Sequence, residues 1–501
     1  MRIIHIDIDS LRPDHLGCYG YHRNTSPTID QLAQEGARFE HVYTSDAPCL
    51  PSRTAMWSGR FGIHTGVVGH GGSAATPFIE GPSRGFVDQF AQTGWMACLR
   101  QAGLHTATIS SFGERHAAWH WHAGFNEIIN TGRAGMDTAD EVVDEALCWL
   151  DRRSDDDDWY LHLNLWDPHT PYQTSESFGN PFANDPLPDW LTEDVWRACW
   201  NGYGPHSPQE PHGFRDEAWL HEPYPWVPAQ IDGMDAVRQW IDGYDTGIRY
   251  ADEQIRRLLD DLDRRGLLDD TAIMVTADHG ENLGELNVWG DHQTADALTC
   301  RVPLVVRWPG GPQGHVDRGY HYLVDWAATT AKLLGNDIPE NWDGQSFADA
   351  FTRAEESGRE YLVSGQGAWA CQRGVRFHRD GTEWLCIQSH HDGYKMLEPI
   401  MLFDLNSDPH EHSNRADDRP EVADRGLALL AQWQREMART SPSNVDPMWT
   451  VLREGGPFHT RGELPDYLER LRATGRGAHA ETLAARHPAE AEGGGAPWIT
   501  P

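Results

Sequence analysis

The sequence predicts an α/β protein whose mainly parallel sheet is sandwiched by helices. Strand-like and helix-like runs alternate over residues 1–365, and this order produces parallel strands joined by helical crossovers. The chain has 501 residues, more than one hydrophobic core usually serves, so a second, smaller unit is expected. A hydrophobic content of 39% and a charged content of 23% are ordinary for a globular protein.

The first elements follow in order from the N-terminus. Residues 2–9 alternate isoleucine with polar side chains, which indicates a strand. The stretch "TSPTIDQLAQEGARF" predicts a helix that begins at a Ser/Thr pair, carries Pro27 in its first turn and ends towards Gly36. Residues 94–110 and 144–166 each have the pattern of a helix followed by a strand.

The alternation continues in the second half of this region. One apolar helical face runs from Ile248 to Leu262, and the helix is expected to end at Gly266. The run "TAIMVTA" then predicts a strand that leads directly into Asp278, and "RVPLVVRWPG" predicts a further short strand.

The pattern changes near residue 365. Residues 366–478 contain short strand-like runs with turns and a helix around residues 420–438, and they predict a smaller α+β subdomain with short antiparallel strands. Residues 479–501 are rich in Ala, Gly, Glu and Pro, which predicts a loosely ordered tail or a packing arm.

Charge and composition exclude several classes of function. The net charge of −35 disfavours nucleic acid as a partner. Lysine occurs only at Lys332 and Lys395, so a site that normally uses lysine must use another residue here. No apolar run approaches the ~20 residues needed to span a bilayer, and the strand-like start "MRIIHIDID" has no export signal. The sequence therefore predicts a cytoplasmic protein without a membrane partner.

Cys49 differs from the other cysteines. The eight cysteines are scattered without close pairs, which does not suggest a disulfide framework, and most lie in apolar runs. Cys49 instead lies in "SDAPCLPSRTAMWSGR". Pro51 and Ser52 indicate a tight turn into a helix whose N-terminus would attract an anion. Arg53 could bind an anionic group bidentately through its planar guanidinium.

Acidic residues at two strand ends predict a cation site. Asp9 ends the first predicted strand, and Asp278 with His279 ends a later one. The carboxyl ends of parallel strands meet at one edge of a sheet, so these residues can converge. Carboxylates that face one another repel unless a cation lies between them, and their oxygens suit Ca²⁺ or Mg²⁺.

Four histidines are candidates for the same site. His169 follows a predicted strand and lies between two prolines, and His292 comes thirteen residues after His279. His116 and His64 lie in glycine-containing loops. Because the chain has 27 histidines, any single one is more often a surface or hydrogen-bonded residue, and only its place in a pattern distinguishes it.

Taken in order, these segments resemble the formylglycine-dependent sulfatases of the alkaline phosphatase superfamily. The first, "DSLRPDHLGCYGY", is close to the family's Asp-x-Leu-Arg-x-Asp opening, and "CLPSRTAMWSGR" matches its Cys-x-Pro-Ser-Arg signature. The segments "DPHTPY", "ADHGENLGE", "CRVPLVVRWPG" and "LFDLNSDPHEHSN" follow at familiar intervals. The resemblance covers roughly residues 2–420 and implies an alkaline phosphatase-like catalytic domain over residues 1–365.

The resemblance also implies the chemistry. A formylglycine-generating enzyme would convert Cys49 into an aldehyde, whose hydrate attacks the sulfur of a small sulfated substrate. Arg53 would hold the sulfate, and His292 or His169 would give a proton to the leaving alcohol. The metal would be Ca²⁺, with Mg²⁺ as the alternative. It would be bound by Asp9, Asp278, His279 and one hydrate oxygen of residue 49.

The opening segment departs from the family pattern. The family's adjacent acidic pair is replaced by Asp9 and Ser10. Asp7 lies two residues earlier on the same strand face, and we expect it to support a ligand, with His5 as a candidate partner, rather than to bind the metal itself.

Both family lysines are also replaced. If three residues are inserted, the Gly-Lys-x-His segment becomes Gly113-Glu114-Arg115-His116, with His116 as a candidate base and Arg115 near the sulfate. An ungapped alignment would place Ser111 and Gly113 there instead. The later lysine falls at Asp291 or His292, of which histidine is the chemically sensible substitute.

The leading prediction is a metal-dependent sulfatase. The 22 tryptophans and the aromatic insertion at residues 188–214 favour a carbohydrate sulfate, although most tryptophans are expected in the core. The runner-up is a phosphonate monoester or phosphodiester hydrolase of the same superfamily, and a third interpretation is a non-catalytic relative that binds sulfated glycans. The oligomeric state stays open and includes a homo-oligomer.

Overall fold

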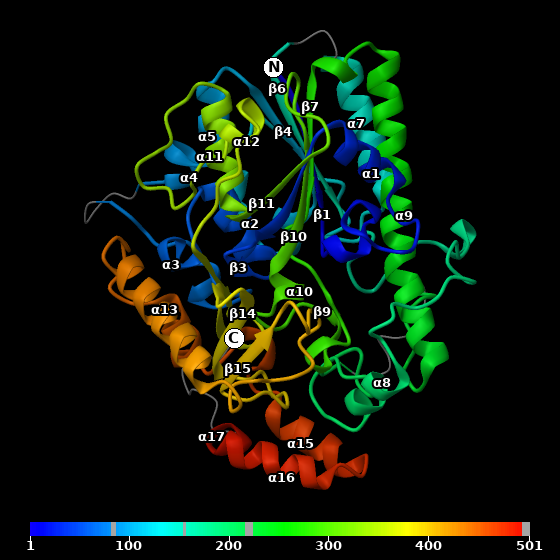
Figure 1. The fold of residues 1–501 in the computed structure, drawn as a ribbon, viewed down its shortest axis with the longest axis vertical. Helices are drawn as coiled ribbons and strands as arrows, with labels where there is room; N and C mark the ends of the chain where they lie inside the picture. Colours follow the sequence, from blue (N-terminus) through cyan, green and yellow to red (C-terminus); the bar gives the residue numbers. More distant parts are fainter. Residues whose placement is uncertain (82–86, 154–156, 216–223, 493–501) are drawn as a thin grey trace.

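The computed structural model describes residues 1–81, 87–153, 157–215 and 224–492, and one eight-stranded sheet forms its centre (Figure 1). The strand order is β11-β2-β10-β7-β1-β6-β4-β5. The strands are β1 (Arg2–Ile8), β2 (Ala37–Tyr43), β4 (His105–Ile109), β5 (Glu127–Ile129), β6 (Trp159–Leu165), β7 (Thr271–Thr276), β10 (Arg301–Arg307) and β11 (His315–Tyr322). Within this sheet β10 runs antiparallel to both of its neighbours, and the other pairs are parallel. The predicted, mainly parallel sheet is confirmed.

Helices cover both faces of the sheet (Figure 1). One face carries α1, α7 and α9, and the other carries α2, α5 and α11. Their bounds are α1 (Pro27–Glu35), α2 (Cys49–Ser58), α5 (Trp95–Gln101), α7 (Ala139–Arg153), α9 (Met234–Arg264) and α11 (Val324–Leu333). The helix predicted around Ile248–Leu262 is the C-terminal half of α9, which begins much earlier.

The central strand β1 is buried on both faces. Every residue from Ile3 to Ile8 is at most 2% exposed. The alternation of isoleucine with His5 and Asp7 therefore separates two buried faces rather than a core face from a solvent face. Buried polar groups of this kind must find partners inside the protein, and Asp7 finds one in the site described below.

A second, five-stranded sheet has the order β15-β14-β13-β12-β3. Its strands are β3 (Asp46–Ala47), β12 (Tyr361–Gln366), β13 (Cys371–Arg379), β14 (Thr382–His391) and β15 (Ile400–Asp404). The last four form antiparallel pairs, and α13 (Pro420–Ala438) packs against them. β3 pairs with β12, so the segment just before Cys49 belongs to this sheet and ties it to the larger one.

The inserted and C-terminal segments pack together. The insertion contains α8 (Glu193–Trp200), and its Tyr203 joins Tyr394 and Tyr467 in one buried cluster. The C-terminal helices are α14 (Pro447–Arg453), α15 (Leu464–Ala473), α16 (Gly477–Arg486) and α17 (Pro488–Ala491). Much of the segment expected to be a loosely ordered tail thus forms α16 and α17, whereas residues 493–501 lie outside the described part.

Short elements complete the described chain. They are α3 (Gly62–Thr65), α4 (Gln89–Thr93), α6 (Phe112–Arg115), β8 (Asn282–Leu283), β9 (Trp289–Asp291), α10 (Ala297–Cys300) and α12 (Asp349–Thr352). None of the helices in the described ranges combines the length and the apolar character needed to cross a membrane.

Candidate active site

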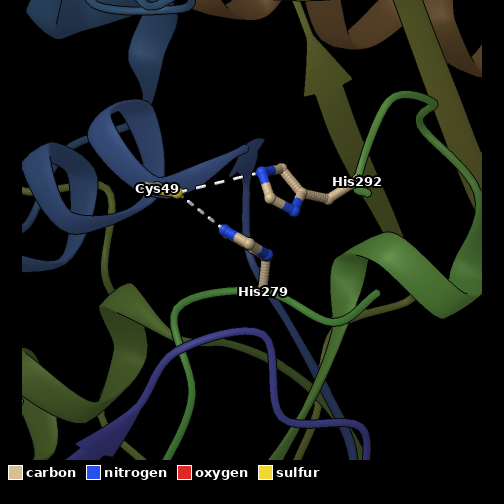
Figure 2. Close-up of side chains that lie close together, drawn as sticks. All are labelled: Cys49, His279 and His292. Carbon is tan, nitrogen blue, oxygen red and sulfur yellow. Dashed lines mark hydrogen bonds between the residues drawn. The ribbon is translucent and has the colours of Figure 1, made fainter. Parts of the chain in front are cut away.

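Cys49 is the first residue of α2 and is 1% exposed. Its Sγ lies 3.0 Å from His279 Nε2 and 3.9 Å from His292 Nε2, and Figure 2 shows both imidazoles directed at the sulfur. Burial, with the nearby charge of Asp9, raises the pKa of the thiol to about 12. The thiolate is the nucleophilic form of cysteine, so unmodified Cys49 is a poor nucleophile at neutral pH.

The structure brings together the metal-ligand set expected from the sequence. Ligand atoms of Asp9, Cys49, Asp278 and His279 all lie within 4.8 Å of one another, and all of these residues are buried. Asp9 follows β1, and Asp278 and His279 follow β7. Because β1 and β7 are adjacent parallel strands, their carboxyl ends meet at one edge of the sheet.

Arg53 reaches into this carboxylate cluster. Its Nε donates to Asp7 Oδ2 at 2.8 Å, and its Nη1 donates to Asp9 Oδ2 at 2.8 Å and to Asp278 Oδ2 at 2.6 Å. The sequence predicts that Arg53 binds an anionic substrate group through two nitrogens. In the structure Nε and Nη1 already bond the carboxylates, and only Nη2, which is buried, has no hydrogen-bond partner among the described residues. Three buried carboxylates attract the guanidinium strongly enough to explain this placement.

Asp7 is the support for that arginine. Its Oδ2 accepts from Arg53 and also lies 3.4 Å from His162 Nε2. The suggested partner His5 makes no hydrogen bond with Asp7, and its Nδ1 lies 2.6 Å from the Tyr160 hydroxyl.

The donor set fits a divalent cation. When all three are ionised, Asp7, Asp9 and Asp278 face a single guanidinium with an excess of two negative charges, and burial of such charge without compensation is costly. Burial and the neighbouring carboxylates raise the pKa of Asp278 well above its usual range despite the opposing charge of Arg53. His279 Nδ1 lies 2.8 Å from the Gly280 carbonyl, to which it donates. This bond leaves the Nε2 lone pair directed at the cluster, as metal-ligating histidines require.

His292 follows β9 and lies beside the nucleophile position. Its ring centroid is 4.0 Å from that of His279, and its Nδ1 is 3.7 Å from Glu281 Oε2. Glu281 is fixed on its other oxygen by the hydroxyls of Tyr172, at 2.8 Å, and Thr170, at 2.9 Å. Burial acts to lower the pKa of His292, but Asp291, the Cys49 thiol and Glu281 together raise it well above its usual range. His292 is therefore equipped to donate a proton towards residue 49.

His169 lies on the other side of Asp9. Its Nε2 is 4.0 Å from Asp9 Oδ1, and its ring centroid is 5.6 Å from that of His292. Burial lowers the pKa of His169 to about 4, so its imidazole is neutral at pH 7.

Arg115 ends α6 and His116 follows it, and with the three-residue insertion they stand in the family's Gly-Lys-x-His segment. Burial and Arg115 lower the pKa of His116 well below its usual value, and its Nε2 is buried without a partner. The Arg115 guanidinium lies 5.2 Å over the Trp166 ring, and its Nη1 donates to the Ala134 carbonyl at 3.3 Å. Ser111, the alternative from an ungapped alignment, donates to Asp137.

One histidine candidate lies elsewhere. His64 Nδ1 is 2.7 Å from Asp343 Oδ2, and its Nε2 is 3.0 Å from the Met437 carbonyl. Its Nε2 thus ties α3 to α13, its Nδ1 ties α3 to the segment between α11 and α12, and His64 takes no part in the cluster around Cys49.

Several residues near the site were missed by the sequence reasoning. Glu281 follows the Asp-His-Gly tripeptide directly, and this proximity was the available signal. His70 and His459 lie at the site from segments far apart in the chain, with His70 Nδ1 2.9 Å from His459 Nε2. His459 stacks on Trp369 at 4.6 Å between ring centroids. No short sequence pattern around His70 or His459 predicts these contacts between distant segments.

The fold and the site together define an alkaline phosphatase-like α/β hydrolase in which a buried carboxylate–histidine cluster of metal-ligand type lies beside Cys49. A family model described as Sulfatase matches residues 2–336. The chain belongs to the sulfatase family and is a sulfuric ester hydrolase.

Individual relatives are similar over most of their length. The choline-sulfatase of Rhizobium meliloti (strain 1021) is 28% identical, over 86% of this chain and 88% of the relative. The structure of BT4656 in complex with its substrate D-glucosamine-2-N,6-O-disulfate aligns with a TM-score of 0.67 at 20% identity, covering 88% of this chain and 99% of that one. A phosphonate monoester hydrolase from Silicibacter pomeroyi aligns with a TM-score of 0.64 at 21% identity, covering 90% and 97%. At these identities the two structures show a shared fold.

Proposed function

We propose that the protein hydrolyses an organic sulfate ester whose alcohol is a carbohydrate, using a formylglycine derived from Cys49 and a divalent cation, with Ca²⁺ favoured over Mg²⁺. One observation carries the proposal: the buried cluster of Asp9, Cys49, Asp278 and His279 joins a weakly acidic thiol to a ligand set with excess negative charge. The formylglycine-generating enzyme is then a required partner, and the substrate is a small sulfated molecule.

The cation and the formylglycine would supply one part of the chemistry. When present, the cation and the hydrated formylglycine would provide a nucleophilic oxygen of lowered pKa and would stabilise charge on the sulfuryl oxygens. The cation would be held by Asp9, Asp278, His279 and residue 49.

The chain's own residues supply the rest. Arg53 balances the carboxylates and offers its free Nη2 to an anionic oxygen. Arg115 is a second cation beside His169 and His116 that can bind the sulfate. His292 donates a proton to the leaving alcohol, and the charge of Glu281, whose Oε2 lies 3.7 Å from His292 Nδ1, favours the protonated ring. Neutral His116, with its Nε2 unpartnered, can accept a proton, and His169 is a second candidate for proton transfer.

A second candidate function is hydrolysis of phosphonate monoesters or phosphodiesters. It is favoured by Ser10, which replaces a family carboxylate and whose hydroxyl donates to Asp9 Oδ1 at 3.0 Å. The replacement of both lysines also reduces the positive charge expected around a sulfate. We place it second because the segment around Cys49 has the Pro-Ser-Arg form typical of sulfatases.

Parallel rate measurements test the choice. Protein produced together with a formylglycine-generating enzyme would be assayed on 4-nitrophenyl sulfate, glucosamine 6-sulfate, choline sulfate, bis(4-nitrophenyl) phosphate and a phenylphosphonate monoester. We expect the highest kcat/KM on a sulfate, and loss of all turnover in Cys49→Ala. A dominant phosphodiesterase or phosphonatase rate would support the second function, and binding of sulfated sugars without turnover would support the non-catalytic interpretation.

A further inference from the structure

We propose that His206, from the inserted segment, is a positioning residue for the proton donor His292 and acts through Asp291. The inference rests on the proposed function, because it concerns how the leaving alcohol receives its proton. Nothing in the motifs around Cys49 points to it, since His206 lies far from them in the sequence.

A chain of three contacts links the insertion to residue 49. His206 Nε2 lies 3.1 Å from Asp291 Oδ2. The other oxygen, Oδ1, accepts the backbone N–H of His292 at 2.7 Å and lies 3.6 Å from His292 Nε2. That same Nε2 faces Cys49 Sγ at 3.9 Å. Asp291 thus uses one oxygen for His206 and the other for both the backbone and the ring of His292.

Asp291 depends on outside groups to hold it in place. Asp291 is 8% exposed. Its carboxylate interacts electrostatically with four basic side chains from different parts of the chain, which are His206, His292, His459 and Lys395. Within the described ranges, this carboxylate makes its hydrogen bonds and ion pairs with His206 and with its sequence neighbour His292. Lys395 Nζ is buried without a hydrogen bond and lies 5.8 Å over the Trp369 ring. The direct orienting contact is therefore the one from His206.

His206 is itself rigidly held. Its backbone carbonyl accepts the N–H of Trp289, in β9, at 2.8 Å. Its ring meets Trp369 edge-on, with 5.2 Å between centroids. Its backbone has φ of +63°, a left-handed conformation that a non-glycine residue keeps only when its surroundings enforce it. The added Cβ of any residue at Gly213 would lie 2.7 Å from His206 Nε2, so the loop closes tightly over the ring.

The chemistry gives this placement a purpose. As the S–O bond to the alcohol breaks, its electron pair passes to oxygen, and a proton on His292 Nε2 transfers to that oxygen. An alkyl alcohol needs this proton because the free alkoxide is a poor leaving group. A nitrophenolate leaving group needs little protonation because its anion is already stable. Misplacing His292 should therefore slow alkyl sulfates selectively, whereas merely loosening the fold should slow all substrates alike.

The test compares His206→Leu, His206→Gln and the control His212→Leu in matured enzyme. His212 lies in the same insertion, with its Nε2 3.4 Å from the Pro228 carbonyl. Glutamine keeps an N–H donor at about the reach of Nε2. We expect His206→Leu to lower kcat by about 10- to 100-fold on an alkyl sulfate that the wild type hydrolyses, with KM little changed. We expect less than about threefold loss on 4-nitrophenyl sulfate, and recovery of most of the alkyl activity in His206→Gln.

Asp291→Asn probes the same contact independently, in case His206→Leu fails to fold. Asparagine still accepts the His292 N–H but loses the charge, and it should show the same selective loss on alkyl sulfates. Equal losses on alkyl and aryl sulfates in these variants, or an equal effect of His212→Leu, would overturn the proposal. If the wild type hydrolyses no sulfate ester at all, the proposed function fails instead.

Discussion

Arg53 donates through Nη1 to Asp9 Oδ2 at 2.8 Å, inside the carboxylate cluster rather than in front of it. The residue that sequence patterns assign to the substrate is therefore first a counter-ion for the site. Its position also gives a role to Asp7, which lies on β1 two residues before Asp9 and accepts from the Nε of the same guanidinium.

Replacing Arg53 should damage stability as well as activity. Arg53→Ala leaves three buried carboxylates unpaired, and we expect a loss of about 3–5 kcal/mol in the free energy of unfolding in calcium-free buffer. Calcium should restore part of that loss, because the cation neutralises the same charges. Urea unfolding with and without calcium measures both effects. An unchanged midpoint in calcium-free buffer would mean that the carboxylates do not depend on Arg53.

Metal binding should depend on the cluster around Cys49. In chelator-treated protein, calcium at 100 times its Kd should stabilise the fold by about 2.7 kcal/mol, seen as a higher Tm. Asp278→Asn should abolish this shift. The matched control is Glu490→Gln, since Glu490, His391 and His487 form another group of metal-ligand type. If Glu490→Gln loses the calcium-dependent rise in Tm and Asp278→Asn keeps it, the cation binds at the group of His391, His487 and Glu490 and not beside Cys49.

Lys395 should destabilise the protein at low pH. Burial lowers its pKa from 10.5 to about 7 despite the nearby charges of Asp291 and Asp392. The unfolded chain then binds more protons than the folded one between these values, so this contribution to stability improves as pH rises from 7 towards 10.5. Lys395→Met removes the penalty, and its Tm relative to wild type should be highest below pH 7. Chemical denaturation across this range checks the slope; a difference independent of pH would contradict the assignment.

His487 should have the opposite pH dependence. Burial opposes its protonation, but hydrogen bonds and charge from Asp392 and Glu490 raise its pKa from 6.5 to about 9. Its contribution is fully present below pH 6.5 and is lost as pH rises through about 9. We expect His487→Ala to cost about 1 kcal/mol at pH 6, allowing for solvent screening, and little at pH 10. A cost that grows with pH would show that the ion pairs do not form.

The sequence was sufficient for the parts of the site that lie at strand ends. Asp9, Asp278 and His279 could be placed because each directly follows a recognisable apolar strand, and adjacent parallel strands deliver their ends to one edge. Cys49 and its helix could be placed because Pro51, Ser52 and the Arg53 signature are local.

The remaining parts depend on packing between distant segments. The contact of Arg53 with Asp7 follows from the charge balance of the assembled cluster, which no local pattern contains. His206 and His459 reach the site because the insertion and the C-terminal helices pack on one another through Tyr203, Tyr394 and Tyr467. The length of α9 and the formation of α16 also exceed what local composition indicated. α9 packs against α1 and α7, and Ala480 and Leu483 of α16 join the buried cluster of the three tyrosines.

The mass of one peptide shows whether residue 49 is a formylglycine in the active enzyme. Trypsin releases Phe39–Arg53, which contains Cys49. In active enzyme from a host with the maturation machinery, we predict that this peptide carries an aldehyde in place of the thiol. It should react with hydroxylamine and resist alkylation by iodoacetamide, and its abundance should scale with turnover. Full turnover from a preparation in which Cys49 is entirely alkylatable thiol would show that the enzyme does not act through formylglycine.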